Sequence, residues 1–191
     1  MRRVKAIIFS LLFCYPAMAQ RMVFTHLNVE NGLSQNSVLA IAQDGRGFMW
    51  FGNRYGLNRY DGHNFKLYKS TLADSTTLSG DYILSLFADG PQTLWVGTAN
   101  GLNKYDAEKD CFERVVVNPA VPAGQDNNIN CIYKDRKGSL WVGTTHGLFV
   151  RTGQKKGWDA TPGIAGNNIR AIYEDHEGIL WVGTTNGLTR I

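Results

Sequence analysis

Few residues of this chain have a type and spacing that could support catalysis or metal binding. The four histidines, His26, His63, His146 and His176, show no metal-ligand spacing. No phosphate-binding motif of the G-x-x-x-x-G-K-[ST] kind occurs, so the glycines indicate turns and not a nucleotide cradle. We therefore expect no catalytic residue, no bound metal and no cofactor.

One acidic residue does recur at a fixed spacing. An Asp stands six residues before a Trp four times, and in three of these cases a Gly follows the Asp by three residues. In a hairpin, an Asp carboxylate accepts hydrogen bonds from turn N–H groups, and a Gly takes positive φ without strain. We therefore interpret these residues as structural: Asp44, Asp89, Asp135 and Asp175.

The tryptophans belong to a unit that occurs four times as W-[FV]-G-x-x-x-G-L, at intervals of 45, 46 and 40 residues. A period of this length indicates a repeat architecture, in which each unit buries its apolar face against the next. The Trp and the Gly two positions later share one face of a strand. We expect both to pack between units, with the Gly admitting a partner side chain. The residues are Trp50, Trp95, Trp141 and Trp181, with Gly52, Gly97, Gly143 and Gly183.

Each unit reads as four short strands: an apolar inner strand, the Trp strand, a third strand after G-L and a weaker outer strand. Four antiparallel strands in 40–46 residues predict a β-propeller blade, and no window has the 3.6-residue period of a helical solenoid. The sequence thus predicts an all-β propeller with four blades, at about 37–70, 82–116, 128–160 and 168–191.

Residues 22–28 read as an outer strand with no inner strands before it. Such a strand would complete the last blade and close a ring. We favour a partial arc of a seven-bladed propeller over a closed four-bladed ring, and both remain open. An arc would leave two apolar blade faces exposed and so favour association.

The first nineteen residues read as a signal peptide. Arg2, Arg3 and Lys5 precede an apolar stretch, and 17–19 (A-M-A) form a cleavage signature, which predicts a periplasmic chain beginning at Gln20. Cleavage leaves 17 Lys and Arg against 16 Asp and Glu, too little positive charge to attract nucleic acid. We expect membrane attachment only through parts beyond this chain.

Two cysteines remain, Cys111 and Cys131. The repeat places Cys111 on the outermost strand of one unit and Cys131 on the innermost strand of the next, so we expect no disulfide between them.

At this point the sequence resembles a known family. The stretch G-L-S-Q-N-S-V-L-A-I-A-Q-D-G-R-G-F-M-W-F-G, residues 32–52, continued by Y-G-L-N-R-Y-D-G, residues 55–62, is similar to the two-component regulator propeller repeats. The resemblance implies the periplasmic sensor region of a hybrid two-component histidine kinase that senses glycan-derived saccharides. We can place no kinase or receiver motif in this chain, so phosphotransfer is expected to lie outside it.

Ligand contacts are expected where the units differ, in the turn between the second and third strands. Arg54 and Tyr55 are the sharpest candidates, because a guanidinium and an aromatic ring suit a sugar or a carboxylated sugar. The same turn supplies Asn100, His146 and Asn186. The expected partners are an oligosaccharide, and either the remaining propeller blades or a second protomer.

Two other interpretations stay open. A propeller enzyme of the streptogramin-lyase type would need a His–Glu or metal pair on one face. Only His146 and His176 are available, and His176 belongs to the opposite, hairpin side. The chain would otherwise be a truncated gene product without an independent function.

Overall fold

The computed structural model describes residues 23–121, 127–153, 155 and 157–191. A short 3-10 turn, η2 (Val29–Asn31), precedes four antiparallel sheets, and each sheet follows the chain from its inner to its outer strand. The first two sheets are β1 (Ala40–Gln43), β2 (Met49–Gly52), β3 (Leu57–Tyr60), β4 (Phe65–Tyr68) and β5 (Ile83–Ala88), β6 (Thr93–Thr98), β7 (Gly101–Asp106), β8 (Cys111–Val115). The last two are β9 (Ile129–Lys134), β10 (Leu140–Thr144), β11 (Gly147–Arg151), β12 (Asp159–Ala160) and β13 (Ile169–Glu174), β14 (Leu180–Thr184), β15 (Gly187–Arg190).

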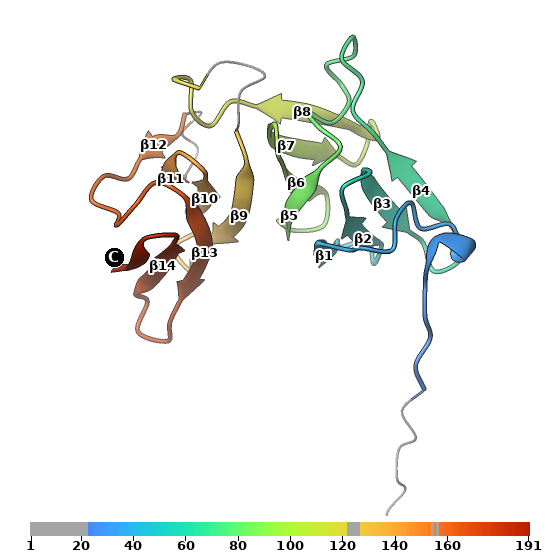
Figure 1. Cartoon of the computed structure of the whole chain (residues 1–191), viewed down its shortest axis with the longest axis horizontal. Coiled ribbons are helices and arrows are strands. Elements are labelled where there is room, and N and C mark those ends of the chain that lie inside the picture. Colours follow the sequence, from blue (N-terminus) through green and yellow to red (C-terminus); the bar gives the residue numbers. More distant parts are fainter. Residues whose placement is uncertain (1–22, 122–126, 154, 156) are drawn as a thin grey trace, which may run out of the picture.

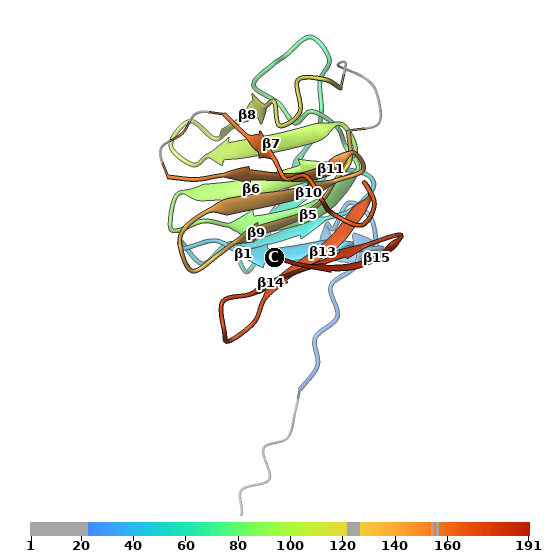
Figure 2. The same ribbon diagram turned by 90° about the vertical axis from the view of Figure 1, so that its left-hand side faces the viewer.

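The sheets are arranged as an open arc of propeller blades (Figure 1). The inner strands line its concave side, where β1 lies beside β5, β5 beside β9 and β9 beside β13. A view turned by 90° shows the sheets stacked face to face (Figure 2). The prediction of an all-β partial propeller is confirmed, and the ring is not closed.

The recurring Asp holds its hairpin together, as expected, and it also binds the Trp. In the first blade, Asp44 Oδ1 accepts the N–H groups of Arg46 and Phe48 at 2.9 and 3.1 Å. Asp44 Oδ2 accepts the Trp50 indole N–H at 2.9 Å. This second role, which the sequence analysis did not predict, allows a polar indole nitrogen to be buried at no loss of hydrogen bonding.

The same indole–carboxylate bond recurs in every blade. It measures 2.8 Å from Trp141 to Asp135 and 2.7 Å from Trp181 to Asp175, but 3.5 Å from Trp95 to Asp89. The second blade, with the longest of these bonds, is the one whose turn contains Gly90 and Pro91 and lacks a Gly three residues after the Asp.

In the first three blades, the Gly of the W-x-G strand leaves a space, which we call the notch, that the next blade fills. An ideal Cβ built on Gly52 would lie only 2.5 Å from Ile83 Cγ2, so any side chain at this position would collide with the neighbouring inner strand. The equivalent pairs are Gly97 with Ile129, at 2.7 Å, and Gly143 with Ile169, at 2.6 Å. The predicted seam of a Trp and a bare Gly is confirmed.

The core therefore lies between blades and not within one. Trp50 packs in the first seam, Trp95 in the second and Trp141 beside the third. The Leu that ends each W-[FV]-G-x-x-x-G-L unit is at most 1% exposed in the first three blades but 62% exposed at Leu188, which has no following blade among the described residues.

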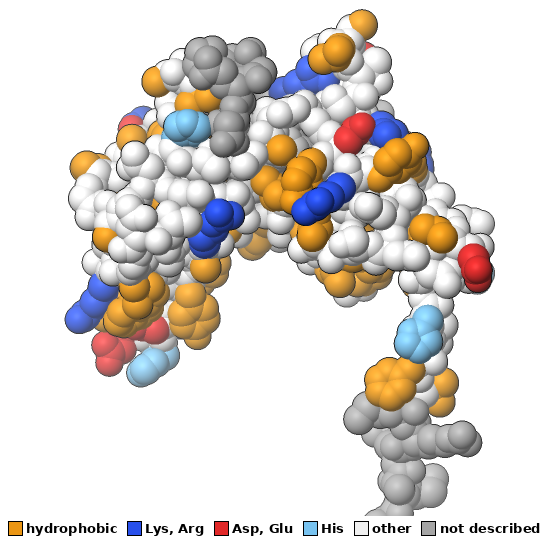
Figure 3. All heavy atoms as spheres, in the orientation of Figure 1, with side chains coloured by type: hydrophobic (Ala, Val, Ile, Leu, Met, Phe, Trp, Pro, Cys, Tyr) orange, Lys and Arg blue, Asp and Glu red, His pale blue; other side chains and the backbone are white. Residues whose placement is uncertain are grey.

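Both ends of the arc expose apolar side chains, as an open arc predicts. Ile41 in β1 is 62% exposed and Tyr173 in β13 is 65% exposed. Figure 3 shows hydrophobic side chains along the lower edge of the arc, over the inner strands and the last sheet.

Two further predictions concern the chain outside the blades. The outer strand expected over 22–28 does not form in the part described: residues 23–28 belong to no strand, and in the open arc they lie at the opposite end from β15. The signal peptide predicted over 1–19 lies outside the described residues.

Cys111 in β8 and Cys131 in β9 are free thiols on the strands predicted for them. Among the described residues no helix is long and apolar enough to cross a membrane.

Candidate ligand-binding face between the first two blades

Arg54 and Tyr55 lie in the turn that joins β2 to β3, and the buried side chain of Asn53 fixes this turn. Asn53 Nδ2 donates to Ser34 Oγ at 2.9 Å, and Asn53 Oδ1 accepts the Tyr55 N–H at 2.8 Å. The Asn53 carbonyl accepts the N–H of Ile83 at 2.9 Å, which ties the turn to the second blade. A fixed backbone therefore presents two exposed side chains.

Residues from both sides of the seam gather around this turn. The Arg54 guanidinium carbon lies 5.1 Å from the ring centroid of Tyr82, which immediately precedes β5. The Lys69 ammonium lies 3.6 Å from the ring centroid of Tyr55 and 3.2 Å from Asp81 Oδ2. We call these five residues, Arg54, Tyr55, Lys69, Asp81 and Tyr82, the seam cluster.

The seam cluster combines two cations, one carboxylate and two aromatic rings. Tyr55 is 53% exposed and Arg54 is also exposed, so ring surface and guanidinium donors both face solvent. Hydrogen-bond donors beside an aromatic face suit a polyhydroxylated ligand with one apolar side, and the excess positive charge suits an acidic group on it.

Each turn between a second and a third strand packs on the linker before the inner strand of its own blade. The contact is a backbone hydrogen bond in the last three blades: Ala99 to Tyr82 at 2.9 Å, Thr145 to Asn128 at 3.3 Å and Thr185 to Asn168 at 3.1 Å.

The other predicted site residues sit in these turns but are not brought together with Arg54 and Tyr55. Asn100 and Asn186 pack on Gly80 and Gly166, where an ideal Cβ would approach each Asn to within 2.9 Å. Both amides thus fill space within their own blade, which indicates a structural role.

His146 is placed differently from the two asparagines. Its Nδ1 lies 3.1 Å from Thr145 Oγ1, and its side chain lines a cavity of about 170 Å³ together with Phe149 and Ile164. His176 lies in the β13–β14 turn at the other end of the sheets and is exposed. The described residues contain no group of three or more His, Cys, Asp or Glu side chains able to hold a metal ion.

The sequence analysis missed Lys69 and Tyr82. Lys69 lies in a linker whose length varies between units, so the repeat alignment gave no signal for it. Tyr82 could have been found from the sequence, because it is aromatic where the other units have a small polar residue. The residues thirteen positions before the Trp in those units are Ser37, Asn128 and Asn168.

Comparison with known proteins agrees with the repeat pattern. A family model described as two component regulator propeller matches residues 32–55, 123–146 and 163–186. Histidine kinase P4 of Formosa agariphila is 45% identical over 74 residues, which cover 38% of this chain and 5% of that protein.

Two solved structures share the fold. The extracellular domain of BT4673 from B. thetaiotaomicron, described as a hybrid two component system, has a TM-score of 0.71 at 24% identity and covers 87% of this chain and 23% of its own. The extracellular domain of BT3049, described likewise and from the same organism, has a TM-score of 0.57 at 27% identity and covers 87% of this chain and 30% of its own.

This chain therefore spans less than a third of each relative. The family model and these two structures come from two-component signalling systems. The chain carries repeats of the two-component regulator propeller family, and its four sheets are a propeller segment of the type found in hybrid two-component sensor kinases.

Proposed function

We propose that this chain is the periplasmic ligand-sensing segment of a two-component receptor, that residues 1–19 direct its export, and that its ligand is a glycan-derived saccharide. Kinase and response-regulator activities would belong to parts outside this chain. The propeller contributes a rigid surface whose occupancy is signalled to those parts.

The observation that carries the proposal is the seam cluster. Its side chains come from both blades of one seam, so a ligand that contacts Arg54 and Tyr82 together would bridge two rigid bodies. Binding to such a site depends on the relative position of the blades, which is what a sensor must couple to its output.

Calorimetric titration with a panel of oligosaccharides tests this proposal. We expect a saccharide to bind, and we expect Arg54→Ala or Tyr55→Ala to weaken binding at least tenfold. Tyr173→Ala is the matched control, because Tyr173 is another exposed tyrosine, on the end face of the arc. Binding that is unchanged in all three variants would place the ligand elsewhere, and a panel without any binder would contradict a saccharide-sensing role.

Export has a separate test. The mature protein recovered from the periplasm of an expressing cell should begin at Gln20 by mass spectrometry. A chain that stays in the cytoplasm with Met1 or Arg2 at its N-terminus would contradict the export proposal.

A further inference from the structure

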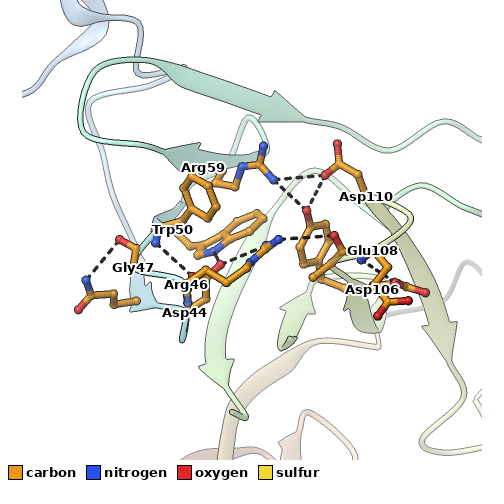
Figure 4. Close-up of polar contacts among 12 residues, drawn as sticks. Asp44, Arg46, Gly47, Trp50, Arg59, Asp106, Glu108 and Asp110 are labelled. Atoms are coloured by element: carbon orange, nitrogen blue, oxygen red, sulfur yellow. Dashed lines mark hydrogen bonds and ion pairs between the residues drawn. The ribbon is translucent and has the colours of Figure 1, made fainter. Parts of the chain in front are cut away.

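Two arginines of the first blade are each held at the first seam by an aromatic ring and a carboxylate. The guanidinium carbon lies 5.2 Å from the ring centroid of Phe48 in Arg46 and 4.8 Å from it in Arg59. Arg46 Nη2 lies 3.4 Å from Asp44 Oδ2, and Arg59 Nη1 lies 3.4 Å from Asp110 Oδ1 (Figure 4). In both cases the charge of a stacked guanidinium is thus balanced by a carboxylate of this chain.

A third arginine of the same blade, Arg54, has the ring but not the carboxylate. Its guanidinium carbon lies 5.1 Å from the ring centroid of Tyr82, across the seam. Its backbone N–H donates to Gln35 Oε1 at 3.2 Å, so the main chain is fixed while the residue stays exposed. Among the described residues, no acceptor is hydrogen-bonded to the Arg54 guanidinium and no carboxylate forms an ion pair with it.

The one carboxylate of the seam cluster is already occupied. Asp81 Oδ1 accepts the backbone N–H of Ser70 at 2.6 Å, and Asp81 Oδ2 lies 3.2 Å from Lys69 Nζ. The charges of Lys69 and Asp81 therefore balance each other. The excess positive charge of the seam cluster resides on Arg54.

The repeat itself does not require a cation at this place. The residues four positions after the Trp in the other blades are neutral: Ala99, Thr145 and Thr185. The same turn therefore forms without an arginine. An exposed guanidinium that is steadied by a ring and has no carboxylate can receive one from a ligand, through two parallel N–H···O bonds.

From this comparison we propose that the saccharide bound at the seam cluster is acidic, and that Arg54 binds the carboxylate of one uronic acid residue. This inference rests on the proposed function. The ligand carboxylate does for Arg54 what Asp44 does for Arg46 and Asp110 does for Arg59. The sugar ring lies beside Tyr55, whose side chain is 53% exposed. Both internal precedents are carboxylates, which favours a uronic acid over a sulfated sugar.

Calorimetric titration with matched trisaccharides tests this proposal. Three series are built on galacturonate, glucuronate and mannuronate, each as the free acid, the methyl ester and the neutral hexose. A sulfated galactotriose completes the set. The methyl ester keeps the shape of the sugar and removes its charge, so in at least one series the acid should bind at least about tenfold more tightly than the ester.

Variants of Arg54 assign this preference to its guanidinium. Arg54→Gln should reduce the ratio of acid to ester affinity to about twofold or less. Arg54→Lys should retain an intermediate ratio, because an ammonium keeps the charge and loses the planar pair of donors. Arg190→Gln is the matched control, since Arg190 is an exposed arginine of β15, and it should keep the ratio of the parent. Added salt should weaken binding of the acid more in the parent than in Arg54→Gln.

The outcomes separate this inference from the proposed function. Neutral hexoses bound as tightly as the acids, with a loss in Tyr55→Ala, would overturn the acidic ligand and leave saccharide sensing in place. A ratio that survives in Arg54→Gln, or tighter binding of the sulfated trisaccharide than of every uronate, would also overturn it. If no saccharide binds, acidic or neutral, the proposed function fails and this inference with it.

Discussion

A methyl group added to the notch glycine should destabilise the protein only where a following blade fills the notch. In Gly52→Ala, the new Cβ would lie 2.5 Å from Ile83 Cγ2 and 2.9 Å from Ile83 Cβ. In Gly183→Ala, the nearest atom would be Ala171 Cβ at 3.7 Å, an ordinary contact. Neither glycine is among those with positive φ, so the backbone accepts Ala at both positions.

The size of the stability loss in Gly52→Ala depends on whether the Ile83 side chain can move aside. Ile83 is fully buried and β-branched, so it cannot rotate away and the sheets must separate slightly. Overpacking of this kind costs about 1–3 kcal/mol, whereas a substitution without a new clash stays within about 0.5 kcal/mol. We expect Gly52→Ala to lose about 1–3 kcal/mol of unfolding free energy and Gly183→Ala almost none.

Urea denaturation followed by tryptophan fluorescence measures both variants against the parent. The two substitutions make the same chemical change in the same W-x-G motif, so each serves as the control for the other. Equal losses would show that the cost comes from strand propensity or the turn. The reasoning about the seam would then be refuted.

Three further predictions concern the hairpin Asp and the cysteines. Asp135→Ala removes the acceptor of the Trp141 indole N–H and of the Ser139 backbone N–H, and should cost about 1–3 kcal/mol in urea denaturation. Burial raises the pKa of Asp135, but hydrogen bonds from Trp141 and Ser139 outweigh it and lower the pKa below its ordinary value. Its stabilising contribution should therefore be present above an unfolded pKa of about 3.9 and be lost as pH falls through the lower folded pKa, so acid titration should destabilise the parent more than Asp135→Ala. Burial raises the pKa of Cys131 to about 12, so iodoacetamide and mass spectrometry should find Cys111 alkylated in the native protein and Cys131 only after unfolding; equal native rates would contradict this.

The features that repeat could be predicted from the sequence, because they depend on contacts that recur in each seam. Trp50 and Gly52 carry a strand-period signal, and the packing of each blade on the next follows from it. Only one of the two roles of Asp44 could be predicted from the sequence. Hairpin chemistry explains its backbone contacts, but the bond to the Trp50 indole joins two strands, and sequence spacing alone does not show that their side chains meet.

Features that break the repeat were harder to predict from the sequence. The seam cluster joins Lys69, in a linker, to Tyr55, in a turn, and linker lengths differ between units. The outer strand expected over 22–28 required a partner edge, and in an open arc that edge lies far away. Local pattern predicts what a segment is able to pair with, whereas the closure of the arc decides whether the partner is within reach.

A double-mutant cycle between Gly52→Ala and Ile83→Ala tests the central claim, that the glycine of one blade receives the isoleucine of the next. Ile83→Ala alone should cost about 2–5 kcal/mol through the cavity it leaves. In the double variant, the added methyl enters that cavity, so the loss should fall short of the sum of the single losses by at least about 1 kcal/mol. Losses that add to within about 0.5 kcal/mol would mean that the two residues do not meet across the seam, which would contradict the stacking of the blades.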